Sequence, residues 1–214
     1  MELNDSHLGK KDYWDNIYVT ELDNYKNNQD DVGEIWFGER TEQKIVDWLV
    51  DNVDSDCSLA DVGTGNGHLL SLLAEEGFSN LTGIDYSASS IKLAAEINSD
   101  YPHIKFICLD VINSTTSHLR HDVCVDKGTY DAISLANTSA ADRITYKQRI
   151  HSMVTPETGM FVLASVNWTV EELSEFYSDY FTLDHVLPCK KFTFGGITGQ
   201  DVSIVIFKPK QTEL

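Results

Sequence analysis

The fold of this 214-residue chain is decided by the stretch Leu59-Ala60-Asp61-Val62-Gly63-Thr64-Gly65-Asn66-Gly67-His68. A short apolar run ends in an acid, three glycines follow at alternate positions, and a leucine-rich helical pattern begins. Gly63 and Gly65 can adopt positive φ and let the backbone approach a ligand closely. The free N–H groups at the start of the helix suit a carboxylate. A dinucleotide-binding loop has a third glycine where His68 stands, so the spacing predicts a different nucleotide-type ligand.

Acids also end the next two predicted strands. Asp85 comes about 20 residues beyond the glycine loop, where an acid can hold a ribose diol. The third strand begins at Lys105 and ends in Asp110. Each acid alone could simply face solvent. Together, at the carboxyl ends of successive strands, the three acids predict one ligand that crosses this edge of the sheet.

Strand and helix patterns alternate through most of the chain. The expected strands are residues 58–61, 81–85, 105–110, 123–126, 160–165, 181–187 and 202–208. Thr41 is expected to cap a helix that runs to about Val53, Ser87 to cap another, and Thr169 to form a capping box with Glu172. A glycine-rich link joins the last two strands. These patterns predict an α/β fold of the Rossmann-like kind, with a mostly parallel sheet, an antiparallel last strand and helices on both faces.

Residues 1–31 differ in composition from the rest of the chain. They are polar, and aromatic residues occur at intervals, namely Tyr13, Trp14, Tyr18 and Tyr25. We expect a partly ordered N-terminal arm that docks where its aromatic side chains find a surface. Residues 32–214 are expected to form one domain, and the arm is expected to close over its ligand.

Charge and composition limit the possible partners. The formal net charge is −18, from 16 basic and 34 acidic residues, which weighs against nucleic acid and favours a basic protein partner. Solubility alone could also explain part of this charge. There is no apolar stretch long enough to span a membrane and no signal-peptide pattern, so we expect a cytoplasmic protein. The four cysteines are scattered, and we expect reduced thiols and no metal site.

The pattern D-x-G-x-G-x-G at residues 61–67 resembles motif I of class I S-adenosylmethionine-dependent methyltransferases. The resemblance implies their seven-stranded sheet and S-adenosylmethionine as the cofactor. It implies that Asp61 accepts a hydrogen bond from the cofactor's ammonium group, directly or through the loop and water, and that Asp110 meets the adenine amino group. The cofactor-binding residues that we expect are Trp36, Asp61, Gly63, Thr64, Gly65, Gly67, Asp85, Tyr86, Asp110, Val111 and Asp126.

A second resemblance is narrower. The string D-K-G-T-Y-D-A-I at residues 126–133 is similar to a family of protein lysine methyltransferases that act on translation elongation factor 1-alpha and include methyltransferase-like protein 10 of animals. Four further segments fit the same family, namely Y-W-D at 13–15, E-I-W-F-G at 34–38, S-V-N-W-T at 165–169 and F-T-F-G-G at 192–196. The resemblance covers nearly the whole chain and implies a basic protein substrate. One loop, A-N-T-S at 136–139, departs from the acidic or proline-bearing loop expected of the family.

The chemistry of lysine methylation suggests candidate catalytic residues. Trp36, Phe37, Tyr130 and Trp168 could form an aromatic slot that lowers the pKa of the lysine. Asp126 could orient the ammonium group and help its proton leave, and Asn167 could accept a hydrogen bond from the amine. The expected catalytic residues are Asp126, Tyr130, Asn167 and Trp168. The aromatic residues could instead be core packing, and Asp126 could be a turn or helix cap.

Other functions stay open at this point. The fourth strand is followed by D-K-G-T in place of the N-P-P-Y or D-P-P-Y tetrad that orients planar amino groups, so an aromatic or amide nitrogen is not the expected acceptor. A small-molecule methyltransferase of the same fold is the main alternative, because a fold does not fix its substrate. A non-catalytic cofactor-binding scaffold is another, and a dinucleotide-dependent dehydrogenase is the most distant.

Overall fold

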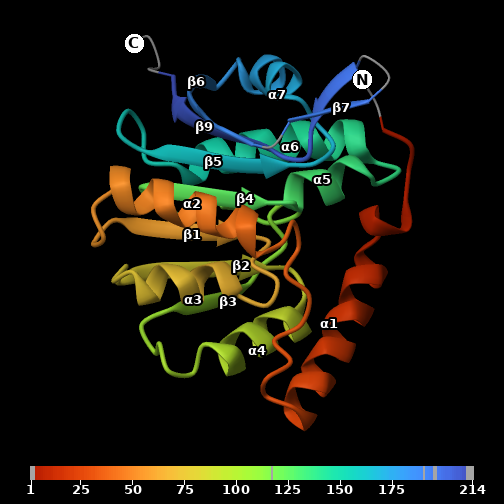
Figure 1. The fold of residues 1–214 in the computed structure, drawn as a ribbon, viewed down its shortest axis with the longest axis vertical. Helices are drawn as coiled ribbons and strands as arrows, with labels where there is room; N and C mark the ends of the chain where they lie inside the picture. Colours follow the sequence, from red (N-terminus) through yellow and green to blue (C-terminus); the bar gives the residue numbers. More distant parts are fainter. Residues whose placement is uncertain (1–2, 117, 190, 195–196, 211–214) are drawn as a thin grey trace.

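A computed structural model describes residues 3–116, 118–189, 191–194 and 197–210, with side chains in 191–200 left out. Its central sheet has seven strands in the order β3-β2-β1-β4-β5-β9-β6 (Figure 1). The strands are β1 (Ser58–Val62), β2 (Asn80–Asp85), β3 (Lys105–Cys108), β4 (Val123–Lys127), β5 (Met160–Ser165), β6 (Phe181–Leu187) and β9 (Ser203–Pro209). Strands β1 to β5 are parallel, and β9 runs antiparallel to both β5 and β6. The predicted fold class is confirmed.

Helices cover both faces of this sheet. They are α2 (Glu39–Asn52), α3 (His68–Glu75), α4 (Ala88–Ile97), α5 (Thr129–Ser134), α6 (Ser139–Met153) and α7 (Val170–Tyr177). One core contains Leu59 of β1 with apolar residues of α2 and α3, and the other contains Ala60 of β1 with residues of α6 and α7. Neighbouring residues of one strand enter opposite cores because side chains alternate along a strand. Parallel strands buried on both faces explain the continuous apolar runs in the sequence.

Several element boundaries differ from the predicted ones. Helix α2 begins two residues before Thr41, and its N-cap is Gly38; the Thr41 hydroxyl donates to the Phe37 carbonyl oxygen (2.7 Å) instead of capping the helix. Ser87 does stand at the N-cap of α4, but its side chain makes no capping hydrogen bond. Thr169 forms the predicted capping box. Strand β3 ends at Cys108, so Asp110 lies in the turn beyond it.

The link between β6 and β9 contains a small hairpin that was not predicted. Strands β7 (Lys191–Phe194) and β8 (Ile197–Gln200) pair antiparallel outside the main sheet. The two adjacent glycines of this link, at 195 and 196, lie outside the described residues. Alternating apolar residues are too few here to distinguish a short hairpin from a loop.

The N-terminal segment is helical and docked. A short 3-10 helix, η1 (His7–Gly9), leads into α1 (Lys11–Asn27), which runs along the carboxyl edge of the sheet and packs against α4 (Figure 1). Tyr18 and Leu22 of α1 are buried with Leu93 of α4. Aromatic side chains of the N-terminal segment therefore pack against α4. The division of the chain into an arm and a domain stays a prediction. In the described part of the chain, no helix is long and apolar enough to cross a membrane.

Candidate active site

A pocket of about 570 Å³ opens at the carboxyl ends of the parallel strands. This volume is within the range of cofactor and small-ligand sites. The glycine loop after β1, the end of β2 and the turn after β3 line one part of it. The other part is lined by the N-terminal segment, the loop before α2, the β4–α5 turn, helices α5 and α6 with their link, and the β5–α7 turn. The position agrees with the general rule that open α/β sheets bind ligands beyond the carboxyl ends of their strands.

The glycine loop approaches the pocket as predicted. Gly63, Thr64 and Gly65 line it, and the two glycines have φ of +77° and +57°. Gly67 does not line the pocket. A Cβ atom there would lie 2.9–3.2 Å from Asn98, Ala94 and Phe106 side-chain atoms, so this glycine permits close packing between the loop and α4.

Asp85 is positioned by the backbone of two neighbouring turns. Its Oδ2 accepts a hydrogen bond from the Gly65 amide (3.1 Å), and its Oδ1 accepts one from the Ser87 amide (2.9 Å). Asp85 lines the pocket beside Tyr86. Burial raises the pKa of its carboxyl above the usual value, and the amide hydrogen bonds oppose that shift. The placement suits a carboxylate that accepts hydrogen bonds from a ligand's hydroxyl groups.

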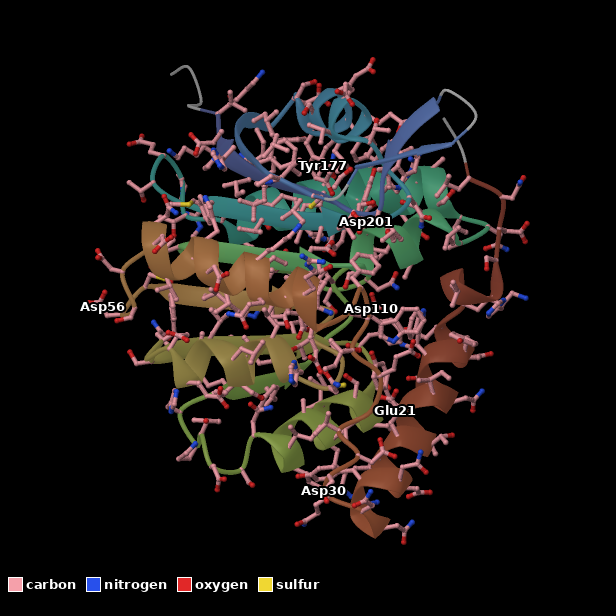
Figure 2. The ribbon with its side chains drawn as sticks, viewed as in Figure 1. Glu21, Asp30, Asp56, Asp110, Tyr177 and Asp201 are labelled. Atoms are coloured by element: carbon pink, nitrogen blue, oxygen red, sulfur yellow. The ribbon has the colours of Figure 1, made fainter. Side chains whose placement is uncertain are left out.

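Asp110 and Val111 line the same part of the pocket. Asp110 Oδ1 accepts hydrogen bonds from the amides of Ile112 (3.0 Å) and Asn113 (3.1 Å), so the side chain shapes the turn in which it lies. Lys11 of α1 approaches it to 3.9 Å. Figure 2 shows Asp110 at the carboxyl edge of the sheet, on the side that α1 covers.

Asp61 lies beneath the pocket. Only 2% of the residue is exposed, and it does not line the pocket. Burial raises the pKa of its carboxyl to about 6, and the positive charge of Lys127 opposes the shift. A hydrogen bond between Asp61 and the ligand, directly or through the loop and water, stays a prediction.

Asp126 caps the start of α5, which is the structural role that the sequence left open for it as an alternative to catalysis. It is fully buried and does not line the pocket. Its carboxylate accepts hydrogen bonds from the amides of Thr129 (2.8 Å) and Tyr130 (2.9 Å) at the start of α5, and from the Tyr146 hydroxyl (2.5 Å). Burial raises its pKa to about 8. The structure therefore does not place Asp126 in contact with cofactor or substrate, and a part in proton removal stays a prediction.

Only part of the predicted aromatic slot lines the pocket. Trp36 and Phe37 line the pocket, and so does Asn167. Tyr130 and Trp168 do not, because both are buried in the core, where their rings pack on one another at 6.0 Å. Aromatic side chains of α6 and α7 pack against the Tyr130 ring. The Trp168 ring is held differently, because its Nε1 donates a hydrogen bond to the Ser134 hydroxyl (3.1 Å).

Other residues of the pocket were not predicted. They include Leu8, Lys11, Trp14, Tyr18, Lys127, Thr129 and Asp131. All seven belong either to the N-terminal segment 1–31 or to the D-K-G-T-Y-D string at 126–131, both of which the sequence singles out. Sequence spacing does not say which members of such a string face a ligand. That depends on how the helices η1, α1 and α5 are oriented around the edge of the sheet.

An unsatisfied polar atom indicates a polar ligand in the pocket. Trp36 Nε1 is buried and has no hydrogen-bond partner among the described residues, and Trp36 lines the pocket. Buried polar groups are nearly always paired, so this N–H group is expected to find its partner on a bound molecule. With the carboxylate of Asp85 nearby, the site fits a cofactor that carries hydroxyl, amino and carboxylate groups.

Comparison with known structures defines the class. The N-methyltransferase NodS from Bradyrhizobium japonicum, in complex with S-adenosyl-L-homocysteine, has a TM-score of 0.67 at 15% identity over 91% of this chain and 100% of its own. The magnesium protoporphyrin IX methyltransferase from Synechocystis with bound S-adenosylmethionine has a TM-score of 0.59 at 16% identity, over 89% of this chain and 95% of that one. A methyltransferase-domain family model matches residues 53–202. This chain is an S-adenosylmethionine-dependent methyltransferase of the seven-stranded Rossmann-like class.

Sequence relatives narrow the family. EEF1A lysine methyltransferase 2 of Danio rerio is 41% identical over 95% of this chain and 88% of its own, and that of Homo sapiens is 40% identical over 95% and 87%. The protein-lysine N-methyltransferase EFM4 of Saccharomyces cerevisiae is 35% identical over 96% of both chains. The chain belongs to this family of protein-lysine methyltransferases, as the resemblance of its motifs predicted.

Proposed function

We propose that this enzyme transfers a methyl group from S-adenosylmethionine to a lysine side chain of translation elongation factor 1-alpha. The observation that carries the proposal is the likeness, over nearly the full length, to animal and fungal relatives named for this reaction or for protein-lysine methylation. The acidic character of the chain, with a net charge of −18, supports a basic protein partner. A cytoplasmic location, expected from the sequence, is part of the proposal.

The cofactor would lie along the carboxyl edge of the sheet, beside the acids that follow successive strands. We infer that the glycine loop holds its methionine end, that Asp85 accepts hydrogen bonds from the ribose, and that the adenine lies near Asp110 and Val111. Trp36 Nε1 is an unpaired donor among the described residues that such a ligand would satisfy. When bound, the cofactor supplies a methyl group that its sulfonium already activates, so the protein contributes alignment and a neutral amine.

The part of the pocket formed by Trp36, Phe37 and Asn167, where we place the acceptor lysine, favours the neutral form of its amine. A lysine with a pKa of about 10.4 is neutral in only about one molecule in 2,500 at pH 7, which costs roughly 4–5 kcal/mol. An apolar wall lowers that pKa because it disfavours the charged form. Trp36 and Phe37 supply such a wall, and we assign Asn167 the role of hydrogen-bond acceptor for the amine, since all three line the pocket.

A labelling experiment tests the proposal. The purified enzyme is incubated with radioactive S-adenosylmethionine and either elongation factor 1-alpha or a protein-free metabolite extract. Label in the elongation factor, absent when its lysines are blocked by acetylation beforehand, is the expected result. Label that appears only in metabolites would instead establish a small-molecule methyltransferase. Mass spectrometry of the factor from cells that lack the enzyme identifies the lysine.

A further inference from the structure

Lys127 is a largely buried cation in the pocket lining, and no role has been assigned to it so far. It follows Asp126 in the D-K-G-T string, and its side chain is only 13% exposed. Its Nζ lies 3.3 Å from Glu42 Oε1 and donates a hydrogen bond to the Trp36 carbonyl oxygen (3.0 Å). Strand β4 is thereby connected to α2 and to the backbone of the loop that precedes α2.

The charge of Lys127 is compensated within a small network. Glu42 is 1% exposed, and its second carboxylate oxygen lies 2.6 Å from His68 Nδ1 at the start of α3. The hydrogen bond to Glu42 raises the pKa of His68. Glu42 thus lies between Lys127 and His68, and its one carboxylate offsets positive charge on both side chains.

The loop that Lys127 contacts forms the aromatic wall of the pocket. Within residues 33–38, Phe37 has a φ of +67°, which is uncommon for a residue with a side chain and persists only where the surroundings enforce it. The Phe37 ring lies against Gly128, where a Cβ atom would be 3.2 Å from Cζ. The Trp36 ring packs edge-on against Trp14 at 4.8 Å between centroids. The hydrogen bond from Lys127 fixes the backbone between these two rings.

We propose that Lys127 is a positioning residue that holds the Trp36–Phe37 wall in the place where it receives the methyl acceptor. The inference rests on the proposed function, because the acceptor is taken to be a lysine amine. Lys127 lines the pocket, but its Nζ is engaged by Glu42 and by the Trp36 carbonyl oxygen, so we assign it no contact with the reacting atoms. A displacement of about 1 Å in a wall that aligns a substrate can lower a rate about a hundredfold, so the loss of this contact is expected to reduce methyl transfer strongly.

A buried lysine elsewhere in the fold is a matched control. Lys147 of α6 is 8% exposed at its side chain, lies 2.8 Å from Asp179 Oδ2 and donates to the Phe176 carbonyl oxygen (2.8 Å). It does not line the pocket. Lys147→Met therefore removes a largely buried lysine with one carboxylate and one carbonyl contact, as Lys127→Met does, but away from the site and with a carboxylate partner that is exposed.

The test measures steady-state methylation of elongation factor 1-alpha, cofactor affinity by calorimetry, and hydrogen exchange of residues 33–38, in which the Gly38 amide donates to the Ile35 carbonyl oxygen (2.9 Å). Lys127→Met is expected to lower kcat/KM for the protein at least about tenfold, to change cofactor affinity much less, and to speed exchange at 33–38. Lys127→Arg, which can still reach a carboxylate and a carbonyl, is expected to restore most of the activity. Lys147→Met is expected to leave both kcat/KM and exchange at residues 33–38 unchanged. Lys127→Gln replaces the Met variant if the latter does not fold.

Three results would overturn the inference: unchanged exchange at 33–38 in Lys127→Met, faster exchange with full kcat/KM, or equal losses in Lys127→Met and Lys147→Met. The exchange measurement needs no protein substrate. If the wild-type enzyme does not methylate the elongation factor, the proposed function fails, while exchange still decides whether Lys127 holds the loop.

Discussion

The hydroxyl oxygen of Thr129 lies 1.7 Å from the position that a Cβ atom on Gly63 would occupy. The same hydroxyl donates a hydrogen bond to the Val62 carbonyl oxygen (2.7 Å). The turn after β4 thus packs directly against the backbone of the glycine loop after β1. The first glycine of the loop is required by this contact as well as by its positive φ.

Gly63→Ala is expected to displace Thr129 and to weaken cofactor binding. The change combines backbone strain of about 1–2 kcal/mol with a lost hydrogen bond of about 1 kcal/mol, so the free energy of unfolding should fall by about 2–3 kcal/mol. Calorimetric titration with the cofactor and denaturant unfolding measure both effects. Gly77→Ala is the control, since Gly77 has a φ of +90° but no atom within 4 Å of its Cβ position. Equal effects of the two variants would show that the Thr129 contact is unimportant.

Asp85→Ala is expected to abolish cofactor binding in calorimetry, because it removes the carboxylate assigned to the ribose. Hydrogen bonds to a charged group contribute about 1.5–3 kcal/mol each. The variant also loses the contacts to Gly65 and Ser87. Asp85→Asn, which keeps an acceptor for one of these amides, separates the two effects and should still bind at least about tenfold more weakly. Unchanged affinity in both variants would remove the ribose assignment.

Asn167→Ala is expected to lower kcat about tenfold and to leave cofactor affinity unchanged, because one hydrogen bond to the reacting amine is lost. Single-turnover methylation at saturating cofactor measures the chemical step. A variant with the wild-type single-turnover rate would exclude Asn167 from the acceptor site.

Removal of residues 1–30 is expected to weaken cofactor affinity and activity together. Leu8, Lys11, Trp14 and Tyr18 form part of the pocket lining. Loss of this cover admits water to the site. A shorter truncation that removes residues 1–5 is the control, since it keeps η1 and α1. Full activity of the longer truncation would reject the idea that the arm closes the site.

Asp126→Asn is expected to change how stability depends on pH. The carboxyl has a pKa of about 8 in the folded enzyme and about 3.9 when unfolded. Between these values the folded state holds more protons, so the contribution of Asp126 to stability is fully present below about pH 4 and is lost as pH rises through about 8.

The asparagine variant lacks this titration. Its melting temperature should therefore rise relative to the wild type between pH 5 and pH 8, with a free-energy difference that changes by up to about 1.4 kcal/mol per pH unit. Thermal unfolding in matched buffers measures this difference. Parallel curves for the two proteins would mean that Asp126 is ionised in the native state.

The local sequence patterns were sufficient for the sheet and for part of the site. Apolar runs that end in Asp61 and Asp85 predicted strands β1 and β2 and their order in the chain, because a buried parallel strand needs such a run. Gly63, Thr64, Gly65 and Asp85 were identified as pocket residues for the same reason: they lie immediately beyond strand ends, where short-range geometry fixes their location.

The sequence by itself thus determined the fold class, the family and the cofactor loop, since each depends on short segments with their own periodicity, glycine conformation or motif. Only the tertiary structure decided that Asp126, Tyr130 and Trp168 are buried behind the pocket while Trp14, Tyr18 and Lys127 face it. The reason is physical: which side of a helix or turn meets a ligand depends on packing between segments far apart in the chain, and no local pattern carries that information.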